Sequence, residues 1–119
     1  YPRLGCFVAC LPGLETDKYH ALAEKYMPNG TCGVISFGVP GGREKVSAFL
    51  DHLKVVSIAT HVADARSCTL YPAGTTHRQL TEEQLEEAGV GIDLVRLSCG
   101  IENTADIIAD LDQALAAVQ

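Results

Sequence analysis

The sequence predicts an α+β fold, a two-layer sandwich in which a mostly antiparallel sheet of about four strands is covered by helices. Segments with helical and strand patterns follow one another as helix, strand, helix, strand, strand, helix, strand, helix. The connections are short and two strands are consecutive, which favours antiparallel neighbours over a purely parallel sheet. The strands are predicted at about residues 32–39, 55–58, 68–71 and 92–98.

Length and composition indicate a single soluble domain over residues 1–119. The hydrophobic share of 47% and the charged share of 20% are ordinary for such a domain. The net charge of −6, with scattered lysines and arginines, argues against a nucleic-acid partner. No apolar run reaches the length that crosses a bilayer, so no membrane partner is expected. The five cysteines form no C-x-x-C pair, and reduced thiols in a cytoplasmic protein are the simplest account of them.

The first half of the chain contains two amphipathic helices. Asp17 can cap the first, which continues to about Met27 with apolar residues at helical spacing on one side. These apolar residues are Tyr19, Leu22, Ala23, Tyr26 and Met27. The second helix covers about residues 43–53. The apolar run at 6–11 precedes both, and we expect it to be an edge strand or a displaced linker that leaves apolar surface uncovered.

The two helices of the second half have clear start signals. Thr81 and Gln84 have the spacing of a capping box. The final helix starts at Asn103, and its apolar stripe is expected to be buried while Asp110 and Asp112 face water. The stripe consists of Ile107, Ile108, Leu111, Leu115 and Val118.

The last strand places an arginine beside a glycine turn. Val95 and Leu97 point to one face, which we assign to the core, and Arg96 and Ser98 point to the other. The turn follows at Gly100. An arginine fork can hold a carboxylate through two parallel hydrogen bonds. A surface arginine on a half-exposed strand fits the same pattern.

The remaining polar residues form no complete catalytic site. His61, Asp64 and His77 could in principle meet at a metal ion, but their spacing matches no ligand template, and no metal is expected. The lysines fall on or beside amphipathic helices, where a solvated role is the default. They are Lys18, Lys25, Lys45 and Lys54. The residues alone therefore predict no catalytic group.

Several segments together resemble the C-terminal domain of the Cys/Met-metabolism family of pyridoxal-phosphate enzymes. Within that family the sequence is most similar to the O-acetylhomoserine sulfhydrylases, also named O-acetylhomoserine aminocarboxypropyltransferases. The matching segments are LPGLE at 11–15, GVISF at 33–37, THVADARS at 60–67, YPAGTTHRQL at 71–80 and VRLSCGIE at 95–102. The resemblance covers the chain from about residue 8 to its end, and it implies the small C-terminal domain of a fold-type I enzyme.

The resemblance also implies which residues bind substrate. In such enzymes the arginine of the last segment binds the α-carboxylate of the amino-acid substrate, and by position this is Arg96. The pair His61 and Val62 lies where side-chain or backbone groups reach the same carboxylate. This sequence departs from the family there, since His61 stands where Ser or Asn is common and Ala63 replaces a common Gly.

The implied function belongs to a longer enzyme. The resemblance predicts a cytoplasmic, homotetrameric transferase of methionine biosynthesis that converts O-acetylhomoserine and sulfide, or a thiol, to homocysteine or methionine-type products. Its pyridoxal phosphate is held by a large N-terminal domain, so the chain is expected to be an excised substrate-binding domain that binds no cofactor and is inactive alone. The alternative is a free-standing α+β module that binds a small acidic ligand or a protein partner.

Overall fold

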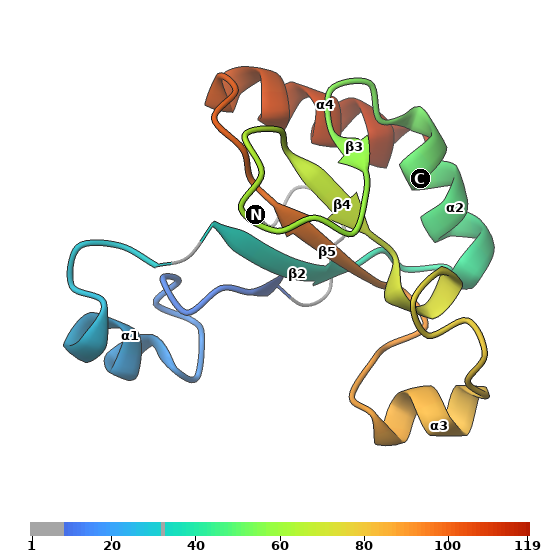
Figure 1. The fold of residues 1–119 in the computed structure, drawn as a ribbon, viewed down its shortest axis with the longest axis horizontal. Helices are drawn as coiled ribbons and strands as arrows, with labels where there is room; N and C mark the ends of the chain where they lie inside the picture. The colour runs from blue at the N-terminus through green and yellow to red at the C-terminus, as the bar shows by residue number, and fades with distance from the viewer. Residues whose placement is uncertain (1–8, 32) are drawn as a thin grey trace.

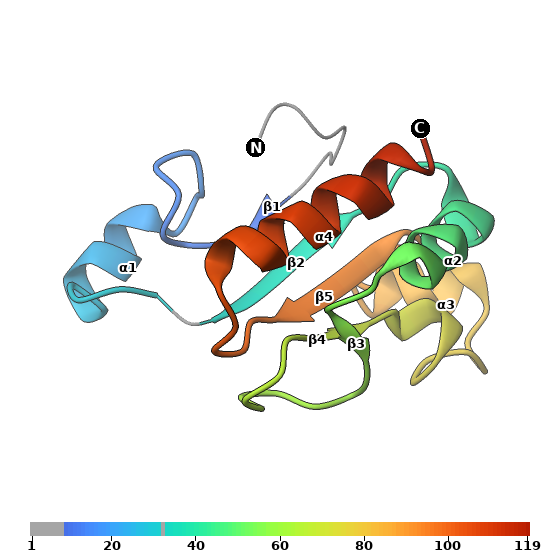
Figure 2. The same cartoon turned by 90° about the horizontal axis from the view of Figure 1, so that it is seen from above.

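The computed structural model describes residues 9–31 and 33–119 and shows an α+β fold. The helices are α1 (His20–Tyr26), α2 (Gly42–His52), α3 (Glu82–Glu87) and α4 (Thr104–Ala116), with a 3-10 turn η1 (Pro72–Gly74). Helices α2 and α4 lie side by side along one face of the sheet, as two perpendicular views show (Figures 1 and 2). Helices α1 and α3 lie apart from this layer, at opposite ends of the molecule (Figure 1).

The sheet is mixed and has five strands in the order β1-β2-β5-β4-β3. The strands are β1 (Ala9–Cys10), β2 (Val34–Gly38), β3 (Ser57–Ile58), β4 (Cys68–Leu70) and β5 (Leu94–Ser98). The pairs β1–β2, β2–β5 and β5–β4 are antiparallel, whereas β3 and β4 are parallel. The parallel pair arises because the chain leaves β3, loops through residues 59–67 and returns in its original direction. Of the apolar run at 6–11, residues 9–10 form the edge strand β1, and residues 6–8 lie outside the described part of the chain.

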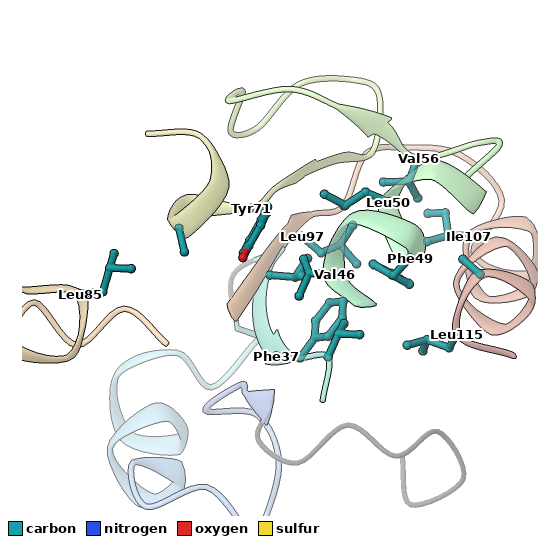
Figure 3. Packing of buried hydrophobic residues seen from close by; sticks show 14 residues of the cluster. Phe37, Val46, Phe49, Leu50, Val56, Tyr71, Leu85, Leu97, Ile107 and Leu115 are labelled. Atoms are coloured by element: carbon teal, nitrogen blue, oxygen red, sulfur yellow. The ribbon is translucent and has the colours of Figure 1, made fainter. Parts of the chain in front are cut away.

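The core fills the space between the sheet and the layer formed by α2 and α4 (Figure 3). Phe37 of β2 packs edge-on against Phe49 of α2, with ring centroids 6.0 Å apart and an interplanar angle of 85°. Val95 and Leu97 of β5 are 0% and 2% exposed. These two strand residues lie on the core face as predicted, because side chains alternate along a strand.

The capping box at the start of α3 is confirmed. The Thr81 hydroxyl accepts the backbone N–H of Gln84 at 3.3 Å, and the Gln84 side chain accepts the backbone N–H of Thr81 at 2.9 Å. Leu85 of this helix is 1% exposed. A purely local signal therefore predicted this helix start, because the cap is made by residues three positions apart.

The apolar stripe predicted on the first helix is largely exposed. Helix α1 is shorter than expected, and Ala23 is its one buried residue. Tyr19 and Leu22 are each 52% exposed, Tyr26 is 70% exposed and Met27 is 40% exposed. Helical spacing shows which residues share a face, but it carries no information on what covers that face. Within the described chain this face of α1 stays exposed to solvent.

The expectation that Asp110 faces water is also wrong, because this α4 residue is only 4% exposed. Its carboxylate accepts the backbone N–H groups of Lys54 and Val55 at 2.8 Å each and of Val56 at 2.9 Å. Burial alone would raise the pKa of Asp110, but these three N–H groups together lower it below the ordinary 3.8. The carboxylate thus ties the segment between α2 and β3 to α4. Asp112 is exposed, as predicted.

Candidate substrate-carboxylate site

Arg96 lies in the middle of β5 on the sheet face opposite Val95 and Leu97. Its cross-strand neighbours are Ser36 of β2 and Leu70 of β4. Strand β5 has a hydrogen-bonded partner on each edge, β2 on one and β4 on the other. Hydrogen bonds to both neighbours fix the backbone around Arg96, and so the position of its Cα. The sheet therefore sets the direction in which the arginine side chain leaves the backbone.

The guanidinium group of Arg96 is anchored on one side only. Its Nη2 donates to the backbone carbonyl of Thr60 at 3.2 Å and to that of His61 at 3.5 Å. Its Nε is buried and has no hydrogen-bond acceptor among the described residues. Buried N–H donors are nearly always paired, and an unpaired one costs about 1–3 kcal/mol. An acceptor supplied by a ligand would remove this cost.

The loop that carries the two anchoring carbonyls has an unusual backbone. Ala63 has a φ of 57°, in the left-handed region that residues with a side chain rarely adopt. Its backbone N–H donates to the hydroxyl of Ser98, which is 3% exposed, at 3.1 Å. The left-handed φ gives a physical reason for the glycine that the resemblance implies at this position.

The predicted residues His61 and Val62 are both close to Arg96 in the chain's fold, but they contribute differently. His61 is exposed and reaches Arg96 through its backbone carbonyl rather than through its imidazole. Val62 is 54% exposed, and no hydrogen bond joins it to Arg96 in the described part of the chain. The structure therefore brings His61 and Arg96 together through the main chain.

A second set of contacts fastens the far end of the same loop to the turn after β5. The Glu102 carboxylate accepts the backbone N–H of Ser67 at 2.7 Å and its hydroxyl at 2.9 Å. The Ser67 hydroxyl in turn accepts the Gly100 backbone N–H at 2.9 Å, and Ile101 donates its N–H to Ala65 O at 3.0 Å. The hydrogen bond from the Ser67 backbone lowers the pKa of Glu102. We call this set of contacts the Ser67–Glu102 latch.

Sequence reasoning did not identify the latch residues as functional. Ser67, Gly100 and Glu102 lie within the two segments that carry the family resemblance, so the segments contained the signal. What the sequence did not reveal is that the two segments touch each other, since Ser67 and Glu102 are 35 positions apart. The hydrogen bonds between Ser67 and Glu102 and between Gly100 and Ser67 show that segments 60–67 and 95–102 are joined to each other near Arg96.

Replacing Gly100 with alanine should destabilise the fold by about 2–3 kcal/mol, the usual cost of overpacking. A Cβ at Gly100 would come within 2.5 Å of Ala65 O and of the Arg66 carbonyl carbon, and backbone atoms cannot move aside cheaply. Urea unfolding would measure the change. Gly33→Ala is the matched control, because its Cβ would meet only Cys99 O at 3.7 Å, an ordinary contact. Equal midpoints for the two variants would contradict this reading of the turn.

Other candidate chemistry forms no site in the described chain. Residues 9–31 and 33–119 contain no group of three or more His, Cys, Asp or Glu side chains arranged to hold a metal ion. Cys68 is a buried free thiol and Cys99 is a half-buried one, and burial raises the pKa of Cys99. Across the same residues, no helix combines the length and the apolar character needed to cross a membrane.

Comparison with protein families gives a match over nearly the whole chain. The family model described as Cys/Met metabolism PLP-dependent enzyme matches residues 8–116. O-acetyl-L-homoserine sulfhydrylase of Leptospira meyeri is 46% identical over 105 residues, which are 87% of this chain and 24% of that protein. Homocysteine synthase of Schizosaccharomyces pombe is 47% identical over 104 residues, with the same coverage of 87% and 24%. L-methionine gamma-lyase of Fusobacterium nucleatum subsp. polymorphum is 44% identical over 104 residues, 87% of this chain and 26% of that protein.

Solved structures agree with the sequence comparison. Cystathionine gamma synthase from Xanthomonas oryzae pv. oryzae, in complex with cystathionine, superposes with a TM-score of 0.84 at 34% identity, over 95% of this chain and 29% of that one. A Campylobacter jejuni protein assigned as an O-acetylhomoserine (thiol)-lyase gives a TM-score of 0.84 at 37% identity, over 93% and 26%. It carries a pyridoxyl-lysine phosphate. This chain therefore spans about a quarter of the length of the relatives that it matches.

The lysines of the chain do not fit a pyridoxal-phosphate site. Lys18, just before α1, and Lys25, on α1, lie over tyrosine rings, with Nζ 4.7 and 5.2 Å from the ring centroids. Lys45 donates through Nζ to the Val118 carbonyl, and Lys54 is exposed at the surface. These four lysines lie on helices or in loops, whereas Arg96 lies on strand β5 of the sheet. We therefore assign no residue of the described chain to the cofactor.

Proposed function

Because this chain belongs to the Cys/Met-metabolism family of PLP-dependent enzymes, we propose that it is the part of such an enzyme that binds the α-carboxylate of the amino-acid substrate. The observation that carries this proposal is the one-sided anchoring of Arg96. Two backbone carbonyls hold Nη2, while the buried Nε–H has no protein acceptor among the described residues. A substrate carboxylate is an acceptor of the right geometry for such a fork.

The two backbone carbonyls have a definite role in this proposal. They accept hydrogen bonds from the guanidinium without adding a negative charge, so the positive charge of Arg96 stays available to an anion. A carboxylate in their place would have formed an ion pair and neutralised it. The anchors therefore fix the orientation of the arginine fork and leave its charge for the substrate. Orienting the substrate by its carboxylate keeps the reacting carbons in place relative to the cofactor, which supplies the electronic chemistry.

We propose O-acetylhomoserine as the amino-acid substrate and sulfide or a thiol as the second substrate. Support comes from the names of two matched relatives, an O-acetyl-L-homoserine sulfhydrylase and a homocysteine synthase. In this reaction acetate leaves the γ-carbon, and the sulfur nucleophile forms a new bond to the same carbon, giving homocysteine or a methionine-type product. The enzyme is expected to be a cytoplasmic homotetramer, as the resemblance implies.

A product assay on the full-length enzyme that contains this chain tests the proposed reaction. With O-acetylhomoserine and sulfide, homocysteine and acetate should form in equal amounts. L-methionine without a second substrate is the control, because one relative is a methionine gamma-lyase. Release of methanethiol from methionine, with no homocysteine from O-acetylhomoserine, would replace the sulfhydrylase assignment with a lyase.

We further propose that the remainder of the enzyme, an N-terminal cofactor domain, covers the exposed apolar face of α1. Tyr19, Leu22, Tyr26 and Met27 form this face and are between 40% and 70% exposed. The matched relatives are about four times longer than the matched segment, so a second domain of sufficient size is expected. Contiguous apolar surface of this kind usually marks an interface.

The isolated chain is therefore expected to self-associate through α1 and to bind an apolar dye. Leu22→Ser together with Tyr26→Ser should shift it toward monomer, because the substitutions remove most of the apolar surface of the helix. Sedimentation velocity and dye fluorescence would measure both effects. Ile58→Ser is the control, since Ile58 is 56% exposed on the edge strand β3, away from α1. A monomer without dye binding at high concentration would count against an interface here.

A further inference from the structure

We infer that Ser98 is a positioning residue for the carboxylate site, because its hydroxyl holds the backbone loop on which Arg96 is anchored. This inference rests on the proposed function and adds to it a residue that does not itself touch the substrate. Ser98 and Arg96 lie two positions apart on β5 and so point to the same face of the sheet. From there the Ser98 hydroxyl meets the loop at Ala63, and the Arg96 guanidinium meets it at Thr60 and His61.

The loop needs such a hold because its conformation is intrinsically unfavourable. An alanine with a φ of 57° is strained by contact between its Cβ and the backbone, and such residues prefer a negative φ. The hydrogen bond from Ala63 N to Ser98 Oγ, at 3.1 Å, fixes the peptide between Val62 and Ala63 and so supports this conformation. The buried hydroxyl therefore offsets the strain and selects the left-handed state of the loop.

Loss of the hydroxyl should act on Arg96 through the loop. Without an acceptor the Ala63 N–H no longer fixes the Val62–Ala63 peptide, and the loop is free to relax toward a negative φ at Ala63. The carbonyls of Thr60 and His61 lie two or three positions before Ala63, so release of the Val62–Ala63 peptide from Ser98 frees the segment that carries them. Arg96 would then lose both anchors, and its fork would sample several orientations. Substrate binding through the carboxylate should weaken without a direct effect on the bond-breaking steps.

The β5 backbone does not depend on this hydroxyl. Ser98 pairs with Val34 of β2 and with Cys68 of β4 through the sheet register, which an alanine at the same position maintains. The latch around Ser67 and Glu102 also closes without it. A Ser98→Ala variant is therefore expected to fold, and its effect should appear in binding.

Steady-state kinetics of the full-length enzyme test the inference. Ser98→Ala should raise KM for O-acetylhomoserine about tenfold, while kcat and KM for sulfide each stay within about twofold. Ala63→Val changes the donor residue of the same hydrogen bond and should also raise KM for O-acetylhomoserine. The reason is that a β-branched residue tolerates the left-handed region poorly. The Ala63 side chain is exposed, so this variant creates no clash in the core. It keeps the test decisive if Ser98→Ala fails to fold.

Ala63→Gly is the matched control at the same position. Glycine adopts a positive φ without strain, so this variant should keep KM at or below that of the parent enzyme. Added to Ser98→Ala, it should recover at least half of the loss in KM. A merely structural role of Ser98 would lower kcat, thermal stability and cofactor content together and would not be rescued by glycine, and that result would overturn the inference.

The outcome can be separated from failure of the proposed function itself. If Arg96→Lys retains normal kcat/KM, the carboxylate is held elsewhere and the proposed function fails. If Arg96→Lys is defective while Ser98→Ala and Ala63→Val keep a normal KM, Arg96 binds the carboxylate without help from the loop, and only the present inference fails.

Discussion

Replacing Arg96 with lysine should lower kcat/KM for O-acetylhomoserine by about 30- to 1000-fold in the full-length enzyme. A charge-assisted contact of this kind contributes about 2–4 kcal/mol, which gives that range of rate constants. Lysine keeps the charge but has no planar fork, so it cannot donate to a carboxylate and to the Thr60 and His61 carbonyls in the same geometry. Steady-state kinetics, together with the absorbance of the bound cofactor, would show loss of activity with retention of cofactor and fold.

His61→Asn is the matched control for this prediction. Among the described residues no hydrogen bond joins the imidazole to Arg96, and the backbone carbonyl that accepts from Arg96 is present in either residue. The resemblance implies Ser or Asn as common residues at this position, so the variant should lose no more than about threefold in kcat/KM. An effect as large as that of Arg96→Lys would mean that the His61 imidazole itself contacts the substrate. Substrate binding would then be assigned to His61 as well as to Arg96.

The placement of Arg96 was predictable from the sequence because it depends on local order alone. Residues alternate between the two faces of a strand, so burial of Val95 and Leu97 fixes the face of Arg96. The start of α3 was predictable for a similar reason, since Thr81 and Gln84 form their cap within one helical turn. Signals of this kind act over three or four positions and are complete in the sequence.

The anchors of Arg96 were not predictable from local patterns. The Thr60 and His61 carbonyls lie 36 and 35 positions away, and backbone carbonyls look alike in every sequence. The alanine at position 63 gave no local sign of its left-handed φ, because alanine is ordinarily a helix former, and only the glycine that the resemblance implies there pointed to it. The resemblance pointed to His61 and Val62 as neighbours of the carboxylate, but the contact between His61 and Arg96 runs through the main chain.

The same limit explains the exposed face of α1 and the wrong expectation for Asp110. Helical spacing correctly groups the apolar residues of α1, but burial depends on a covering surface that the described chain does not supply. For Asp110, exposure was expected and burial is found. An acidic residue in an amphipathic helix normally faces water, and here it is buried by three N–H groups located 54 to 56 positions earlier in the chain.

Asp110→Ala should destabilise the domain by about 2–4 kcal/mol, the largest loss of stability that we expect from a single polar residue. The substitution leaves the backbone N–H groups of Lys54, Val55 and Val56 without their acceptor, and the last of these contacts is buried. Hydrogen bonds to a charged group contribute about 1.5–3 kcal/mol each, and solvent can replace part of the outer two. Asp112→Ala is the matched control, because Asp112 lies on the same helix and is exposed. It should change the free energy of unfolding by less than about 0.5 kcal/mol.

The contribution of Asp110 should also depend on pH, in a direction that the hydrogen bonds fix. Its pKa is lower in the folded state than the ordinary 3.8, so the unfolded state takes up the proton first as the pH falls. Stability from this group is therefore fully present above about pH 5 and is lost progressively below about pH 4, as the pH approaches the folded-state pKa. Urea unfolding from pH 7 to pH 3 should show a steeper loss of stability for the parent chain than for Asp110→Asn, which cannot titrate. Parallel curves for the two proteins would show that the carboxylate is not held by these N–H groups in solution, and the tie between α4 and the segment before β3 would have to be abandoned.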